Sequence, residues 1–200
     1  MTISTIKSRP IYPGLSPDLN ARSNLIVCDK GGAAAVTELF SRADDAFAKR
    51  TTVLIADSLD DADVQALKTE LAPAMIEILP TLSGGITRLR DYLDVAPMGL
   101  RLYAAGIEPL IGSVVQTAAD YAIDHLSIRT EHRGSLMRRV QCVHCKGFIE
   151  NVTTNPVTCS HCGLTLLVRD HYSRRLAAFQ GVCIDAEVPG DVPETEALYQ

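Results

Sequence analysis

The sequence has no surplus of positive charge and no long hydrophobic run. Its formal net charge is −5 and its pI is about 5.5, so no positive field would attract nucleic acid or an anionic membrane surface. No apolar run approaches the roughly 18 residues that cross a bilayer, and the first twenty residues lack the basic and apolar segments of a secretory signal. We therefore expect a cytoplasmic protein that binds neither nucleic acid nor membrane.

A recognisable catalytic set is also missing. No Ser/His/Asp or Cys/His arrangement is discernible, and the GxGxxG pattern of dinucleotide-binding loops is absent. We therefore assign no catalytic residue. What is present is a chain of 200 residues that is 46% hydrophobic, which suits one medium globular domain with a small appended module.

Short apolar runs alternate with stretches of helical periodicity through the first two thirds of the chain. The predicted strands lie at 25–28, 52–56, 75–79 and 100–105, and each is followed by apolar residues at helical spacing. Continuous apolar strands joined by amphipathic helices predict a parallel sheet that is covered on both faces. The fold class is therefore α/β, with a doubly wound parallel sheet over residues 22–133 and a small cysteine module behind it.

The remaining segments differ in composition from this domain. Residues 1–21 carry four turn-forming prolines and glycines, which predicts an N-terminal arm that either docks on a partner or is a frayed terminus. The cysteine module is expected at 139–182. Residues 183–200 form an acidic tail, which we interpret as a solvated segment.

Four cysteines predict a metal centre. Cys142 and Cys145 form one CxxC pair, Cys159 and Cys162 form a second, and thirteen residues separate the pairs. Two such knuckles are typical of a zinc ribbon, because each turn places two thiolates on one side of a tetrahedral ion. A closed set of four thiolates leaves no position for water or substrate, so the metal would stabilise the module's fold rather than catalyse a reaction.

Other features of the knuckles refine this prediction. Zinc is favoured over iron, although a tetrahedral sulfur site also accepts iron. Gly147 and Gly163 follow the two knuckles and would permit a positive φ as the chain turns away. His144 and His161 are surplus as ligands, and we expect them to face solvent or a partner.

The ends of the predicted strands are candidate ligand loops, because open parallel sheets bind ligands there. Gly31 and Gly32 open a helix and could offer N–H groups to a phosphate, but Asp29 at the mouth of that turn would repel one unless Lys30 offsets its charge. We favour the alternative that the two glycines permit a tight turn and close helix packing. Cys28 is interpreted as a buried core thiol.

The order of these segments resembles the nucleotide-binding half of the ferredoxin–NADP reductase family over roughly residues 22–133. The run Leu102-Tyr103-Ala104-Ala105-Gly106-Ile107-Glu108-Pro109 is similar to that family's strand ending in Cys-Gly-Pro, with Ala105 in place of the cysteine. The resemblance implies cofactor-binding positions at Gly31, Gly32 and Gly106, in a degenerate form. The flavin-binding barrel of a complete reductase is missing.

A narrower resemblance covers the C-terminal part. The segments 159–163 and 168–182 are similar to the ending of the small A subunits of bacterial dimethylamine monooxygenases. That family implies a non-catalytic accessory subunit of an NADPH-dependent monooxygenase that demethylates dimethylamine. Its partners would be a haem-containing oxygenase subunit and a flavin and iron–sulfur reductase subunit, which would hold the haem, flavin and iron–sulfur cofactors.

Two other functions remain open from the residues themselves. The chain could be an active NAD(P)H-binding or electron-transfer component, or a zinc-ribbon regulatory protein. Arg169, His171, Arg174 and Arg175 form a basic cluster beside Tyr172 and Phe179. Arginine and aromatic side chains are enriched at interfaces, so Arg174 and Arg175 are either a subunit contact or a solvated face.

Overall fold

The computed structural model describes residues 8–200, which divide into two compact units. The first unit comprises Tyr12–Gly134, and the second combines residues 8–11 with Ser135–Gln200. The chain therefore begins in the second unit, runs through the first and returns. Residues 12–21, which the sequence placed in a separate arm, belong to the first unit, while residues 1–7 of that arm lie outside the described range.

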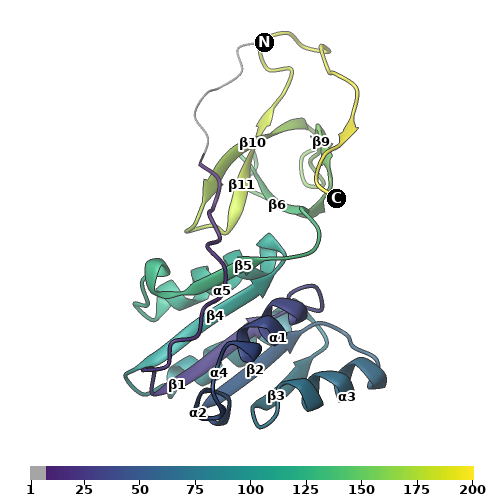
Figure 1. The fold of residues 1–200 in the computed structure, drawn as a ribbon. Coiled ribbons are helices and arrows are strands. Elements are labelled where there is room, and N and C mark those ends of the chain that lie inside the picture. The colour runs from purple at the N-terminus through teal and green to yellow at the C-terminus, as the bar shows by residue number, and fades with distance from the viewer. Residues whose placement is uncertain (1–7) are drawn as a thin grey trace. The chain divides into compact units, whose positions relative to one another are not determined.

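Five parallel strands form the sheet of the first unit (Figure 1). They are β1 (Ser23–Cys28), β2 (Thr51–Ala56), β3 (Met75–Leu79), β4 (Leu100–Gly106) and β5 (Arg129–His132). Their order across the sheet is β3-β2-β1-β4-β5, and every neighbouring pair is parallel. The predicted parallel sheet is thereby confirmed. The order reverses between β1 and β4, which makes this pair the topological switch point.

Helices cover both faces of this sheet. They are α1 (Ala33–Ser41), α2 (Asp45–Lys49), α3 (Asp61–Glu70), α4 (Leu82–Asp94), α5 (Glu108–Asp120) and the short 3₁₀ helix η1 (His125–Ser127). Side chains of α1 and α2 pack on one face, and those of α4 and α5 pack on the other. Such two-sided covering explains why the strands are apolar throughout instead of alternating with polar residues.

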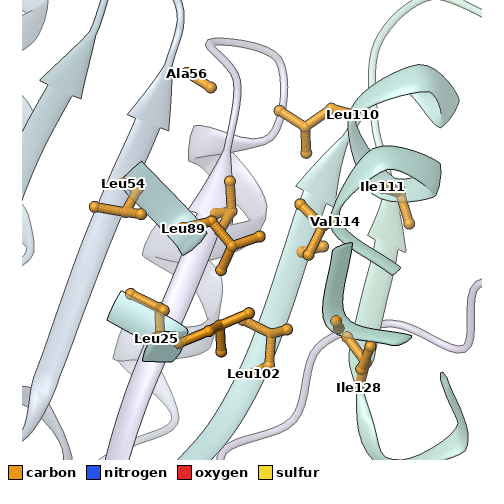
Figure 2. Close-up of a cluster of buried hydrophobic side chains, with 13 residues drawn as sticks. Leu25, Leu54, Ala56, Leu89, Leu102, Leu110, Ile111, Val114 and Ile128 are labelled. Carbon is orange, nitrogen blue, oxygen red and sulfur yellow. The ribbon is translucent and has the colours of Figure 1, made fainter. Parts of the chain in front are cut away.

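Figure 2 shows the buried cluster between the sheet and helices α4 and α5. Leu89 from α4 and Val114 from α5 lie beside Leu54 and Leu102 of the sheet. Each of these four side chains is at most 2% exposed. A cluster of similar size, which includes Phe47 and Tyr103, fills the opposite face. The first unit therefore has a largely apolar core on each face of its sheet.

Part of the N-terminal arm docks on the outer edge of this sheet. The Gly14 N–H donates to the Thr130 carbonyl, at 3.0 Å, and the Leu15 N–H donates to the Glu131 carboxylate, at 2.8 Å. Leu15 itself is 3% exposed. These contacts hold this stretch of the arm against the edge strand β5.

The second unit is a sheet of short strands. They are β6 (Arg138–Cys142), β7 (Phe148–Val152), β9 (Val157–Thr158), β10 (Thr165–Ser173) and β11 (Ala178–Cys183), in the order β7-β6-β11-β10-β9. Two of its antiparallel pairs, β6–β7 and β9–β10, are hairpins with one CxxC pair near each turn. A separate pair joins β8 (Thr154–Asn155) to β12 (Glu196–Ala197).

Most of the acidic tail is exposed, as expected for a solvated segment, but its end is packed. Leu198 and Tyr199 donate their N–H groups to the Thr153 carbonyl, both at 3.0 Å, and Tyr199 is only 8% exposed. Exposed acidic residues precede this anchored end, among them Glu187 and Glu194. Within residues 8–200, no helix has the length and apolar character needed to cross a membrane.

Candidate functional site

The two hairpins bring all four predicted cysteine ligands together. Their sulfur atoms lie within 4.8 Å of one another. The Sγ atoms of Cys142 and Cys162 are 3.8 Å apart, and those of Cys145 and Cys159 are 3.7 Å apart. A regular tetrahedron with metal–sulfur bonds of about 2.3 Å places sulfurs about 3.8 Å apart. The cluster therefore has the dimensions of a four-coordinate thiolate metal site.

The same backbone turn builds both knuckles. In the first, the Lys146 N–H donates to the Cys142 carbonyl, at 2.9 Å, and in the second the Gly163 N–H donates to the Cys159 carbonyl at the same distance. The positive φ predicted at Gly163 is present, at 77°, whereas in the first knuckle Lys146 adopts it, at 65°, instead of Gly147. The left-handed position thus falls four residues after the first cysteine in both turns.

Gly147 serves a different purpose from the one predicted. A Cβ atom at this position would lie 2.4 Å from the imidazole ring of His161, which belongs to the other knuckle. The Nε2 atom of that ring also lies 2.9 Å from the Phe148 carbonyl oxygen. His161 therefore braces one knuckle against the other, and both His161 and His144 are exposed, as expected.

The surroundings of the sulfurs favour a bound cation. Burial opposes the Cys159 thiolate, but the N–H groups of His161 and Cys162 and the neighbouring thiols lower the pKa of Cys159 to about 7. The Leu164 N–H favours the Cys162 thiolate, yet burial and the other sulfurs raise the pKa of Cys162 to about 12. One of the four thiols thus loses its proton readily, whereas a second thiolate beside it is disfavoured by repulsion between the negative charges. A bound divalent cation would relieve this repulsion.

A second site of interest lies at the switch point of the α/β sheet. The Asp29 side chain is 7% exposed and points back into the protein. Its Oδ1 atom accepts the Gly32 N–H at 2.7 Å, and its Oδ2 atom accepts the Ile107 N–H at 2.9 Å. The glycines named from the sequence, Gly31, Gly32 and Gly106, are thereby brought together around a carboxylate of the chain itself.

Two of these glycines are required by close contacts. A Cβ atom at Gly32 would lie 2.1 Å from the Ala105 carbonyl oxygen, and one at Gly106 would lie 2.3 Å from the Asp29 carboxylate. Burial raises the pKa of Asp29, the N–H groups of Ile107 and Gly32 lower it, and Asp57 raises it again, so that it lies above its usual value. These contacts support the close-packing interpretation of the glycine turn.

The cysteines outside the metal cluster lack the features of a nucleophile. Cys28 is 1% exposed, and burial raises the pKa of its thiol, as expected for a core residue. Cys183 is partly buried and donates its thiol to the Asp185 carboxylate at 3.2 Å, which raises its pKa. Neither thiol is activated for chemistry.

Arg138 makes several buried contacts in the second unit that could not be predicted from the sequence. Its guanidinium lies 4.1 Å from the ring centre of Phe179 and 4.0 Å from that of Tyr199. It also donates to the Asp170 carboxylate at 2.9 Å, and the same carboxylate accepts Arg9 at 2.5 Å. This buried arginine links both chain ends to the sheet of the second unit. Partners so distant in sequence leave no local pattern that could reveal it.

The basic cluster after the second knuckle divides into an exposed and a buried part. Arg174 and Arg175 are exposed at the turn between β10 and β11. Tyr172 instead packs edge-on against Phe179, with ring centres 5.0 Å apart, and Phe179 is 4% exposed. Phe179 therefore belongs to the core with Tyr172 packed against it, and the two arginines are exposed beside this pair.

The chain thus combines a doubly wound α/β domain with a small domain built around four clustered cysteines that could hold a metal ion. The chain belongs to the family of dimethylamine monooxygenase subunit DmmA-like proteins, whose N-terminal domain matches residues 4–128 and whose C-terminal domain matches residues 139–182. It is 34% identical over 119 residues to the heme-dependent oxidative N-demethylase delta subunit of Ectopseudomonas mendocina (strain ymp). That match covers 58% of this chain and 63% of the relative, which is less than two thirds of its length. No solved structure matches the chain.

Proposed function

We propose that this chain is a non-catalytic accessory subunit of a multisubunit, NADPH-dependent haem monooxygenase that oxidatively demethylates dimethylamine. Membership in the DmmA-like subunit family carries this proposal. The relative's name describes a delta subunit of a heme-dependent N-demethylase, which supports the same role here. The haem would reside on an oxygenase subunit, and the flavin and iron–sulfur groups on a reductase subunit, all in the cytoplasm.

The geometry of the metal centre supports a structural role for the ion. Cys142, Cys145, Cys159 and Cys162 would hold one Zn²⁺ ion and complete its coordination, which leaves no position for a substrate or a water molecule. Bound zinc would supply folding free energy to the second unit. A subunit of this kind contributes surfaces to a complex rather than a reaction centre.

Arg174 and Arg175 are the proposed contact with a partner subunit. Both residues are exposed at the turn between β10 and β11. A guanidinium can bind a carboxylate of another protein through two parallel hydrogen bonds, and arginine is enriched at protein interfaces.

The test is a co-purification with the double variant Arg174→Glu/Arg175→Glu. We expect it to lose association with the oxygenase and reductase subunits and to lose NADPH-dependent turnover in the reconstituted complex, with metal content unchanged. The matched control, Lys49→Glu/Lys68→Glu, reverses two exposed lysines of the α/β unit and should bind normally. Wild-type stoichiometry for the arginine variant would reject this contact. Failure of the wild-type chain to associate with any monooxygenase subunit would reject the proposed function itself.

An electron-transfer component is the second candidate function, because the sulfur geometry favours it as well. Sulfurs 3.7 and 3.8 Å apart also suit a single iron ion in a rubredoxin-like site. An iron centre would change redox state between NADPH and haem, whereas zinc would not. The visible absorption of the metal-loaded chain separates the two candidates.

A further inference from the structure

The switch point between β1 and β4 is where an open α/β sheet offers a ligand crevice. Loops leaving these two strands diverge toward opposite faces of the sheet, since β1 continues into α1 and β4 continues into α5. In nucleotide-binding sheets, the N–H groups at the starts of such helices bind phosphate. What occupies this position decides whether the unit can bind an anion.

The position is filled from within. Asp29 directly follows β1, and its two carboxylate oxygens each accept one N–H group, from Gly32 and from Ile107. Those residues are the N-caps of α1 and α5, and neither has a side chain that could accept a hydrogen bond from the first turn of its helix. A single carboxylate thus satisfies donors at the N-termini of two helices of nine and thirteen residues.

The surrounding backbone is shaped to this carboxylate. Gly106 has a φ of +137°, and a Cβ atom there would overlap both Asp29 oxygens. Gly31 approaches from the other side, where a Cβ atom would lie 3.3 Å from Oδ1. The neighbouring Asp57 carboxylate accepts the Lys30 N–H at 3.1 Å and adds a second negative charge at the same end of the sheet. A phosphate would therefore meet a position that the Asp29 carboxylate already occupies, while the Lys30 ammonium at the same loop is paired with Asp63 at 2.6 Å.

We propose that Asp29 is a built-in anion: its carboxylate permanently occupies the anion-binding position at the switch point and caps α1 and α5 in place of a ligand phosphate. The α/β unit keeps the architecture of a nucleotide-binding fold with the ligand position filled by its own side chain. Only a small anion, of the size of a carboxylate group, fits this position, and only after the side chain is removed. This inference rests on the geometry of the first unit and is independent of the proposed subunit function.

The test is rescue of Asp29→Ala by formate in the full-length chain. The variant should melt about 5 °C below the wild type, because two helix N-termini lose their acceptor. Sodium formate should restore at least half of this loss, whereas sodium chloride at equal ionic strength should not. The wild type should show no specific response to formate, and inorganic phosphate and NADPH should leave its melting temperature unchanged.

Two further variants make the result decisive. Asp57→Ala removes a partly exposed carboxylate from the same end of the sheet and should show no response to formate. Asp29→Asn keeps the side-chain volume, so it should be less stable than the wild type yet insensitive to formate; it also provides the measurement if Asp29→Ala does not fold. Equal responses of Asp29→Ala to formate and chloride, an Asp29→Asn protein as stable as the wild type, or micromolar binding of NADPH to the wild type would each overturn the proposal.

Discussion

The two units of this chain differ in what stabilises them. Among residues 8–200, the buried clusters of the α/β unit contain 13 and 12 residues, and those of the C-terminal unit contain five and three. Two of the three residues in the smallest cluster, Cys142 and Cys159, belong to the group of four cysteines that could hold a metal ion. Small cores rarely close without a disulfide or a metal. Apolar packing is therefore extensive in the first unit, whereas the second has two small clusters and gathers four thiols that could hold a metal ion.

The units also use buried polar groups differently. In the α/β unit, Asp29 accepts two backbone N–H groups and joins two helices to the sheet. In the C-terminal unit, Arg138 stacks between two aromatic rings and binds Asp170. The first arrangement closes a ligand position, and the second fastens chain ends onto a small sheet. Each unit thus has its own buried polar contacts, so a substitution at Asp29 or at Arg138 should affect one unit at a time.

Loss of a metal ligand should have the largest effect. Cys142→Ser removes a fully buried thiolate, so we expect loss of the bound metal and unfolding of the C-terminal unit, with the helices of the α/β unit retained. Hydrogen exchange resolved by peptide would show fast exchange confined to residues 135–200. Cys183→Ser is the matched control and should exchange as the wild type does. Simultaneous loss of protection in both units would contradict the comparison.

A cavity in the α/β core should give the next largest effect. Leu89→Ala truncates a side chain that is 0% exposed within the cluster in Figure 2 and leaves a cavity. The cavity should lower the free energy of unfolding by about 2–5 kcal/mol. Denaturant titration followed by circular dichroism measures this loss. Metal content should stay at the wild-type value, because no ligand is touched. Release of metal by this variant would mean that the two units are coupled.

Removal of the buried arginine should have a smaller effect, confined to the second unit. Arg138→Ala deletes two cation–π contacts and a charge-assisted hydrogen bond, which should cost about 2 kcal/mol. Limited proteolysis should then cleave the tail near Tyr199 more rapidly. The control is Arg139→Ala, whose guanidinium lies over Phe148 at 4.3 Å and pairs with the exposed Glu150. Equal cleavage rates for both variants would show that Arg138 does not anchor the tail.

The smallest predicted effect is a pH dependence of the second unit. Burial opposes the charge on Asp170, but the Arg9 and Arg138 guanidiniums outweigh it and lower the pKa of Asp170. A lowered folded-state pKa means that this carboxylate stabilises the unit above about pH 4 and loses its contribution as the pH falls through the folded-state value. We expect acid titration, followed by hydrogen exchange, to show that the wild type loses protection in the second unit at a higher pH than Asp170→Asn does. The protection of each protein is expressed relative to its own value at pH 7. Identical transitions would contradict this role.

Much of the fold could be predicted from the sequence because its patterns are local. Strands buried on both faces appear in the sequence as apolar runs. The CxxC spacing predicts a turn that places two thiolates on the same side of a metal ion. Helix α2 escaped prediction because five residues, Asp45–Lys49, are too few to show a helical period. The sequence did not show that Tyr172 and Phe179, which lie beside Arg174 and Arg175, pack against each other, because composition alone cannot distinguish a small core from a contact surface.

The features that the sequence could not predict depend on long-range contacts. The direction of the Asp29 side chain is fixed by the Ile107 N–H, 78 positions away, so the sequence indicates a carboxylate at the loop but not that it turns inward. Arg138 likewise depends on rings and charges from both ends of the chain. At both sites, residue type identifies candidate chemistry, and only the tertiary fold decides which partner each group finds.

The central claim is that the four cysteines hold a structural metal rather than an electron carrier. The most direct test is elemental analysis combined with the absorption spectrum of the full-length chain purified from its native cells. We predict about one zinc ion per chain and a colourless protein, because four thiolates complete the coordination of Zn²⁺ and this ion has no redox chemistry. Stoichiometric iron with visible thiolate-to-iron absorption that bleaches on reduction would contradict the claim and identify the chain as an electron-transfer component.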